Sequence, residues 1–336
     1  MFSYTQRFAV IRQNLFQTCK CFLCFAVVLC FMIGCARNVT ENSPREENTN
    51  SEVNYAHVVD IGKRAQAIGP LKNGATLAER ERFVESGVEL LDLLKIVLQN
   101  GISIREELRP RRHETHGQDT FLHFKPLATL IKESCLLAVE KKDTQMALQN
   151  AFLLINLGKS ICYGGDSDDQ AMGFIFATQG ATLLYKYIRT QPNGLDDSVL
   201  DIFAGLTEGI ELGAVTVARL PERDDRRHKL VYEKAVEIQS NRVFVMIACL
   251  DMCRVAYELE RHRMALGKYP LSLQEVRGLL VLPIDPWGEV YAYSSDGNSY
   301  QLYSKGIDKV DNGGYTPEIS VLVSTGQGDI DVGEIK

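Results

Sequence analysis

Histidine and acidic side chains with the chemistry of metal ligands lie close together in the stretch RPRRHETHGQD. His113 and His116 flank Glu114, and His123 follows a few residues later. Imidazole nitrogens and carboxylate oxygens bind zinc and other transition metals. The stretch is also strongly polar and charged, which is typical of an exposed loop. Of the two interpretations, the exposed loop is the simpler.

The segment GGDSDDQ contains a second set of candidate ligands. Asp166, Asp168 and Asp169 are spaced like alternating calcium ligands. The segment lacks the glutamate that an EF-hand loop carries at its twelfth position. Asp168 or Asp169 is better used as the N-cap of the helix that follows, because a side-chain oxygen there can accept an unpaired backbone N–H.

Catalytic motifs are absent from the chain. It has no P-loop, no G-x-S-x-G and no H-E-x-x-H. Glu258, Glu260, Asp285 and Asp308 could line an acidic cleft where a helical region meets the C-terminal segment, but their spacing does not require one. We therefore expect a protein that is not an enzyme. A hydrolase or ligand-binding protein with a site at that junction is the alternative.

The N-terminal residues have the pattern of a signal peptide. Residues 1–20 carry three basic and no acidic side chains, and the apolar run CFLCFAVVLCFMIG follows. At about 14 residues, this run is short for a helix that must cross a ~30 Å hydrocarbon core, but it suits a signal peptide. It ends at Gly34-Cys35, which resembles the bacterial lipobox, although Met32 stands where leucine is commoner. We expect acyl chains on Cys35 and attachment to a membrane surface; an ordinary signal peptide or an uncleaved anchor is the alternative.

Composition and charge extend this prediction. Loss of residues 1–34 would change the net charge from −6 to −9, and an acidic chain without a basic block is not expected to bind nucleic acid. Residues 36–54 are rich in Asn, Glu, Ser and Thr, as in a solvated tether. The predicted divisions are a leader over 1–34, a tether over 35–55, a helical domain over 56–240 and a C-terminal domain over 241–336.

Four cysteines remain beyond Cys35. Cys249 and Cys253 are four residues apart on an expected helix, and we predict that both are small buried residues. A disulfide between Cys135 and Cys162 is compatible with export, but spacing alone does not establish it.

A period near 3.6 in the apolar residues predicts a mostly helical chain from about residue 56. Short turn-like segments separate the helices, which favours an array of antiparallel helical hairpins. Asp143 or Thr144 can cap one of them, and the aromatic residues of 174–187 are expected in the core. The expected helices cover 77–99, about 122–140, 143–160, 169–190, 196–218 and 228–264.

The chain changes character after the long helix. Gly267 would end that helix, and Ser272 would cap a short helical turn. Two alternating stretches flank Asp296-Gly297 and predict an antiparallel hairpin. We expect Trp287 to pack against the end of the long helix. The segment ISVLVS over 319–324 is compatible with a further strand.

Five motifs in this region resemble the C-terminal domain of the major pseudopilin of type II secretion systems, over about a quarter of the chain. The resemblance implies a small α+β domain with a short antiparallel sheet that shares the long helix 228–264. Pseudopilins begin with a peptidase site and an apolar filament helix, which have no counterpart here. The motifs are Ala256-Tyr257, Gly267-Lys268-Tyr269-Pro270, Asp285-Pro286-Trp287-Gly288 with Tyr291 and Tyr293, Tyr303-Ser304 with Gly306-Ile307-Asp308, and Asp329-Ile330-Asp331-Val332-Gly333.

The same resemblance implies a calcium site. Its carboxylate ligands would be Asp308, Asp329 and Asp331, with backbone carbonyls completing a shell of six to eight oxygens at about 2.3–2.6 Å. The segment between Asp308 and Asp329 is longer than the family's usual loop, so Asp311 could replace or supplement a ligand. Turn aspartates without a metal are the alternative.

These observations together predict an exported, membrane-anchored lipoprotein on the periplasmic face of the inner or outer membrane. Its expected partners are the membrane, through the lipid, and proteins of the envelope or of type II secretion or pilus-like machinery. The secretion link is an analogy of fold.

Overall fold

The computed structural model describes residues 49–99, 118–162, 167–190, 226–279 and 281–333, and most of these residues are helical. Cys35, the tether up to residue 48 and the helix expected over 196–218 lie outside these residues, as do His113 and His116. None of the described helices is long and apolar enough to cross a membrane. The described residues belong to one compact unit.

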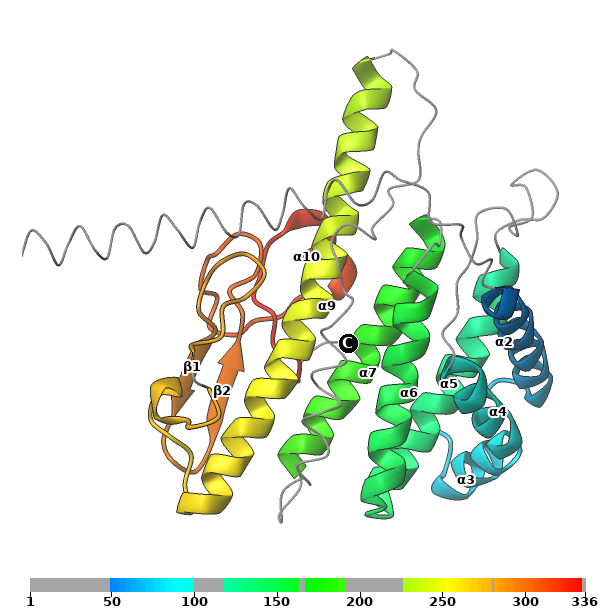
Figure 1. Cartoon of the computed structure of the whole chain (residues 1–336), viewed down its shortest axis with the longest axis horizontal. Helices are drawn as coiled ribbons and strands as arrows, with labels where there is room; N and C mark the ends of the chain where they lie inside the picture. The colour runs from blue at the N-terminus through cyan, green and yellow to red at the C-terminus, as the bar shows by residue number, and fades with distance from the viewer. Residues whose placement is uncertain (1–48, 100–117, 163–166, 191–225, 280, 334–336) are drawn as a thin grey trace, which may run out of the picture. The chain divides into compact units, whose positions relative to one another are not determined.

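The long helices pack side by side in an order that follows the chain (Figure 1). Each contacts the next, and the C-terminal segment packs against α9 and reaches α7. Two shorter helices, α3 (Leu77–Glu85) and α4 (Val88–Gln99), pack against the first members of the row. The row consists of α2 (Thr49–Ile68), α5 (Gln118–Glu140), α6 (Thr144–Cys162), α7 (Ser167–Thr190) and α9 (Arg226–Leu266).

The prediction of one helix over 77–99 is wrong, because the helix stops at Glu85 and resumes at Val88. A Cβ atom on Gly87 would lie 2.4 Å from a methyl carbon of Leu130 in α5. The break therefore brings bare backbone against α5, and α4 then buries Leu91 and Leu94. A periodic pattern of apolar residues continues through such a break and does not reveal it.

The turn between α5 and α6 confirms the predicted cap. Asp143 Oδ1 accepts the backbone N–H of Met146 at 3.0 Å. The chain reverses through Lys142, whose φ of 59° is in the left-handed region, and the N–H of Asp143 returns to the carbonyl of Ala138 at 2.8 Å. These bonds satisfy groups that would otherwise be unpaired at both helix ends.

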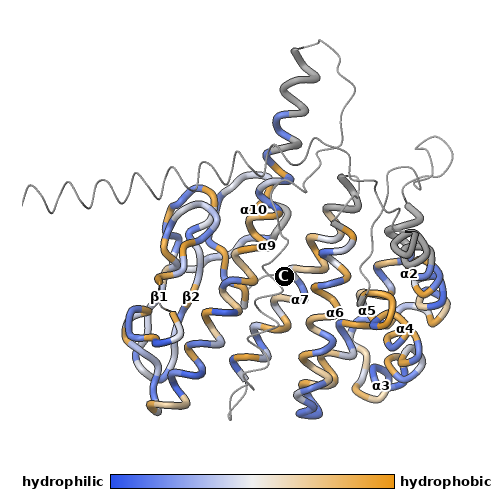
Figure 2. The backbone as a smooth tube through the Cα atoms, in the orientation of Figure 1, coloured by the Kyte–Doolittle hydropathy of each residue, from blue (hydrophilic) through white to orange (hydrophobic). Residues whose placement is uncertain are grey.

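Apolar residues concentrate along α6 and α7 (Figure 2), and the core there is dense. The expected core aromatics Phe174, Phe176, Tyr185 and Tyr187 are all buried. A Cβ atom on Gly158 of α6 would lie 2.4 Å from backbone atoms of α7, so this glycine permits close approach of the two helices.

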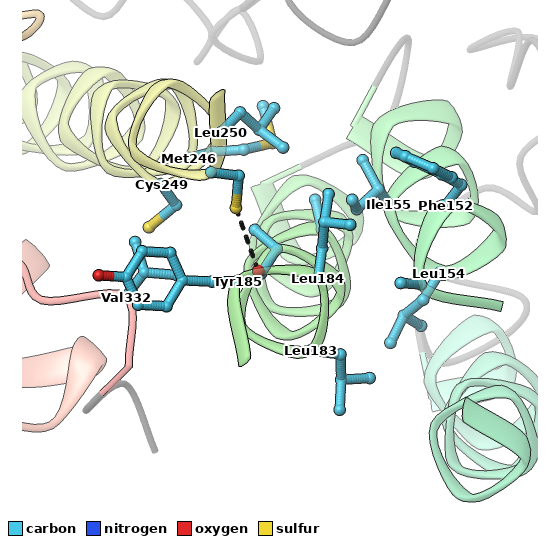
Figure 3. Close-up of a cluster of buried hydrophobic side chains, with 14 of the residues drawn as sticks. Phe152, Leu154, Ile155, Leu183, Leu184, Tyr185, Met246, Cys249, Leu250 and Val332 are labelled. Atoms are coloured by element: carbon cyan, nitrogen blue, oxygen red, sulfur yellow. Dashed lines mark hydrogen bonds between the residues drawn. The ribbon is translucent and has the colours of Figure 1, made fainter. Parts of the chain in front are cut away.

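Cys249 and Cys253 are fully buried, as predicted. Burial raises the pKa of both thiols, and Cys253 donates to the carbonyl of Ala181 at 3.3 Å. The side chains of Tyr185, Cys249 and Val332 gather in one group (Figure 3), so the end of the C-terminal segment belongs to the same core as α7 and α9. Cys135 is a free cysteine, and its thiol donates to the carbonyl of Ala147 at 3.3 Å.

The predicted elements that follow the long helix are present. Gly267, at φ 76°, ends α9, and Ser272 caps the 3₁₀ turn η3 (Leu273–Glu275). Strands β1 (Ala292–Ser295) and β2 (Tyr300–Tyr303) form a two-stranded antiparallel sheet. The carboxylate of Asp296 accepts the N–H groups of Asn298 and Ser299 and so stabilises the turn of this hairpin.

Two expectations for this region are wrong. The segment ISVLVS is part of a helix, α10 (Ile319–Thr325), which packs against α9 and buries Leu322 and Val323. A short apolar run does not by itself distinguish a strand from a helix. Trp287 lies edge-on to Phe244, with ring centroids 5.7 Å apart, and therefore contacts the middle of α9 and not its end.

The predicted boundary between residues 240 and 241 falls inside α9. Buried apolar residues on both sides of this position belong to one continuous cluster, which extends from Val58 to Val332.

Candidate functional site

Three of the five motifs meet around the buried side chain of Asp285. Its Oδ1 accepts the N–H groups of Trp287 at 3.0 Å and Glu289 at 2.9 Å, and its Oδ2 accepts the hydroxyl of Ser304 at 2.6 Å. The backbone of Ser304 exchanges two hydrogen bonds with Ile330, at 3.0 and 2.8 Å. Both oxygens of Asp285 are therefore engaged in holding the C-terminal segment together.

Asp329 is the predicted calcium ligand with the most ligand-like surroundings. Its side chain is fully buried, and its Oδ2 accepts the N–H groups of Asn312 at 2.8 Å and Gly314 at 2.7 Å. Its Oδ1 is also buried and has no hydrogen-bond partner in the described part of the chain. Burial raises the pKa of Asp329 although the two amides oppose this shift. A bare buried carboxylate oxygen fits a bound cation.

Asp311 lies near enough to Asp329 for its negative charge to raise the pKa of Asp329 further. Its own pKa is lowered, because its Oδ1 accepts the hydroxyl of Tyr303 at 2.7 Å and the N–H of Gly313 at 3.0 Å. The structure thus brings Asp311 toward Asp329 through the loop that contains Asn312 and Gly314.

The other two predicted ligands have different surroundings. Asp308 is exposed, and its Oδ1 accepts the N–H of Val310 at 3.0 Å within a turn. Asp331 Oδ1 accepts the N–H of Gly333 at 2.8 Å, and its charge acts on Tyr185 of α7. Within the described ranges, no three His, Cys, Asp or Glu side chains form a group that could hold a metal ion. Of the aspartates considered as ligands, Asp329 is the one with a buried oxygen that has no hydrogen-bond partner among the described residues.

The buried carboxylate of Glu260 also has a structural role. It accepts the hydroxyl of Tyr269 at 2.7 Å and the Nε–H of Arg263 at 2.8 Å. These bonds fix the corner at Tyr269-Pro270 to the end of α9. Burial of Tyr269, together with the hydrogen bond that its hydroxyl donates to Glu260, raises its pKa to about 12.

A cavity of about 400 Å³ lies between the C-terminal end of α9 and the residues that follow η3. Of the four acidic residues considered for a cleft at this junction, Glu258 is the one that lines it. The spacing of Glu258, Arg261 and His262 places them on one helix face, a signal that was present in the sequence. The loop that closes the cavity, with Arg277 and Gly278, had no comparable signal.

A second cavity of about 420 Å³ lies where α3 and α4 meet α5 and α6. Its lining includes the apolar side chains of Val84, Val88, Leu91, Leu137 and Met146. Lysines on its wall are paired with carboxylates of the same wall, as in Lys141 with Glu81 at 2.8 Å. Its surroundings do not include residues of the C-terminal segment.

The aspartates of GGDSDDQ lie where the structure gives no side-chain description. Comparison of the chain with protein-family models, with curated proteins and with solved structures finds no match.

Proposed function

We propose that this chain is an exported lipoprotein, anchored through Cys35, that acts as a non-enzymatic protein-interaction component of the cell envelope. Its C-terminal segment would serve as a pseudopilin-like module carried on a helical body. The observation that supports this best is the hydrogen-bonded unit of Asp285, Ser304 and Ile330, because it joins three of the motifs that carry the resemblance.

The use of two buried acidic side chains, Asp285 and Glu260, supports a non-enzymatic role. Asp285 and Glu260 have both carboxylate oxygens engaged in hydrogen bonds that hold the backbone or fix a corner. A general acid or base needs an oxygen within reach of a substrate proton. These two carboxylates are therefore poor candidates for catalysis.

The C-terminal segment also carries apolar side chains on its surface. Ile284 and Val290 pair as backbone bridge partners and are 56% and 44% exposed, and the nearby Val281 is 79% exposed. Exposed apolar residues that form a patch mark contact sites for other proteins, and we assign this role to the pair Ile284 and Val290. The partner class is a membrane-attached protein of the envelope or of pilus-like secretion machinery.

Crosslinking in intact cells followed by purification from membranes tests this proposal. Envelope or secretion proteins should be recovered with the wild-type chain and lost with the double variant Ile284→Asp, Val290→Asp. Ile96→Asp is the matched control, because Ile96 is 60% exposed on α4. Recovery of no such component with the wild type would contradict the proposal.

The lipid anchor has its own test. Cys35→Ser should abolish labelling by a fatty-acid analogue and release the protein into soluble fractions, since the thiol is the acylated group. Cys30→Ser, within the apolar run, should leave both properties unchanged. Membrane retention of the Cys35→Ser chain would identify an ordinary uncleaved anchor instead.

Calcium is part of the same proposal. Asp329 would supply the central carboxylate, with Asp311 next to it, and the ion would attach the end of the chain to the loop over 311–314. The hydrogen bonds of Asp329 to Asn312 and Gly314 already join these segments, and the bare Oδ1 leaves one ligand position open.

A second candidate function is ligand binding at the junction of α9 and the C-terminal segment. The cavity lined by Glu258 favours it, because charged and apolar side chains converge there. Native mass spectrometry of the purified chain should reveal a bound small molecule. The Gly278→Leu variant should lose it, because the new side chain would fill the cavity.

A further inference from the structure

The junction cavity carries charges of both signs around an apolar wall. Its helical side comes from one face of α9, and its other side comes from the loop after η3. Two carboxylates and two guanidinium groups line it, together with one imidazole. The lining residues are Glu258, Arg261, His262, Ala265, Leu266, Glu275, Val276, Arg277 and Gly278.

Glu258 provides a negative charge that its surroundings compensate weakly. The residue is 7% exposed, and its Oε1 lies 3.4 Å from Nη1 of Arg261, a long and partly exposed ion pair. A largely buried carboxylate in a long ion pair favours an additional cationic donor.

Gly278 leaves room for the carboxylate of Glu258. A Cβ atom there would lie 1.8 Å from Oε2 of Glu258, so any other residue would push the carboxylate aside. Because glycine has no side chain, it leaves space for the carboxylate of Glu258.

Arg277 provides the opposite charge on the same cavity. Its side chain is exposed and makes no ion pair or hydrogen bond with the described part of the chain. A planar guanidinium without a partner suits a carboxylate, which it can bind through two N–H groups. Ala265, Leu266 and Val276 supply an apolar wall beside these charges.

The mixture of charges narrows the ligand class. A simple anion would meet Glu258 and Glu275, and a simple cation would meet Arg261 and Arg277. A molecule that carries both charges satisfies both sets. The cavity volume of about 400 Å³ is within the range of small-molecule sites.

We propose that the junction cavity binds a zwitterion with an apolar side chain, of the amino-acid or short-peptide class. Its ammonium group binds Glu258, its carboxylate binds Arg277, and its side chain packs on Leu266 and Val276. This inference rests on the second candidate function, that is, on ligand binding at the junction.

Calorimetric titration of the purified full-length chain tests the proposal on the ligand side. The probe is the dipeptide leucyl-glycine, compared with its N-acetylated form and with its C-terminal amide. Saturable binding of the dipeptide and loss of binding for both derivatives is the expected result. Equal binding of either derivative overturns the proposal, as does the absence of saturable binding at millimolar dipeptide.

Variants test it on the protein side. Glu258→Gln and Arg277→Gln should each weaken binding roughly tenfold to a hundredfold, because each removes one charge-assisted contact. Glu85→Gln is the matched control, since Glu85 lines the other cavity. Unchanged affinity in Glu258→Gln would overturn the assignment. If the dipeptide fails to bind but native mass spectrometry finds another bound molecule, the ligand class is wrong and the second candidate function stands.

Discussion

The carboxylate of Asp285 accepts the hydroxyl of Ser304 at 2.6 Å, although 19 residues separate the two in the sequence. Both side chains are buried. The bond joins the turn before β1 to the end of β2, and Ser304 continues the connection to Ile330 through its backbone. The side-chain bond and the two backbone bonds of Ser304 thus link three regions of the C-terminal segment.

Replacement of Asp285 should show how much this contact contributes to the free energy of unfolding. Asp285→Ala removes the acceptor of two backbone N–H groups and one hydroxyl, and we expect it to lower the free energy of unfolding by about 2–4 kcal/mol. Asp285→Asn keeps one acceptor oxygen and should cost less. Urea unfolding followed by circular dichroism measures the difference. Glu237→Gln, on the exposed surface of α9, is the control, and an equal effect of the two changes would contradict the prediction.

Calcium should stabilise the chain through Asp329. We expect the melting temperature of the wild type to be higher in calcium than in chelator, because an ion that binds the folded state stabilises it by mass action. Asp329→Ala should remove this increment and Asp311→Ala should reduce it, whereas the exposed Asp308→Ala should keep it. Differential scanning fluorimetry with and without chelator gives the increments. No increment in the wild type would remove the calcium assignment.

The stability contributed by Asp329 should depend on pH in chelator. Burial raises its folded-state pKa above the ordinary value of 3.8, so the folded chain binds this proton more tightly than the unfolded chain. The contribution is fully present below the unfolded-state pKa and is lost as the pH rises through the raised folded-state pKa. Compared with Asp329→Asn, the wild type should therefore lose unfolding free energy as the pH rises across this interval. Denaturant unfolding at a series of pH values measures the difference, and a slope of opposite sign would show that the shift has been assigned wrongly.

Gly158 should tolerate no side chain. A Cβ atom there would lie 2.4 Å from backbone atoms of Gly173 and Ala177, which cannot move as the end of a flexible side chain can. We expect Gly158→Ala to destabilise the fold by about 1–3 kcal/mol, although alanine favours helix more than glycine does. Asn156→Ala, at an exposed position of the same helix, should be neutral or slightly stabilising. Chemical denaturation compares the two, and a stabilised Gly158→Ala chain would show that α6 and α7 can separate at little cost.

Local features were predictable from the sequence. The 3.6-residue period identified α5, α6, α7 and α9, and Asp143 and Ser272 cap the elements that they were expected to cap. The hairpin around Asp296-Gly297 was predictable because this dipeptide favours a tight turn between two strands. Each of these features depends on dihedral preferences and hydrogen bonds within a few residues, so the necessary information lies in a short window of sequence.

Features that depend on distant neighbours were decided by the tertiary structure. The helix break at Gly87 follows from the approach of Leu130, and the helix at ISVLVS is stabilised by burial against α9. The resemblance in sequence pointed to Asp308, Asp329 and Asp331 as neighbouring ligands. In the folded chain, the residue near Asp329 is instead Asp311, which the loop over 311–314 brings toward it.

The junction cavity shows most clearly which features the sequence predicts and which depend on tertiary structure. The sequence by itself places Glu258, Arg261 and His262 on one face of a helix, because that face follows from helical geometry. Whether the loop with Arg277 and Gly278 packs against this face depends on how the whole C-terminal segment is buried on α7 and α9. Burial of this kind sums many weak contacts between residues far apart in the chain, and it therefore becomes visible in the folded structure.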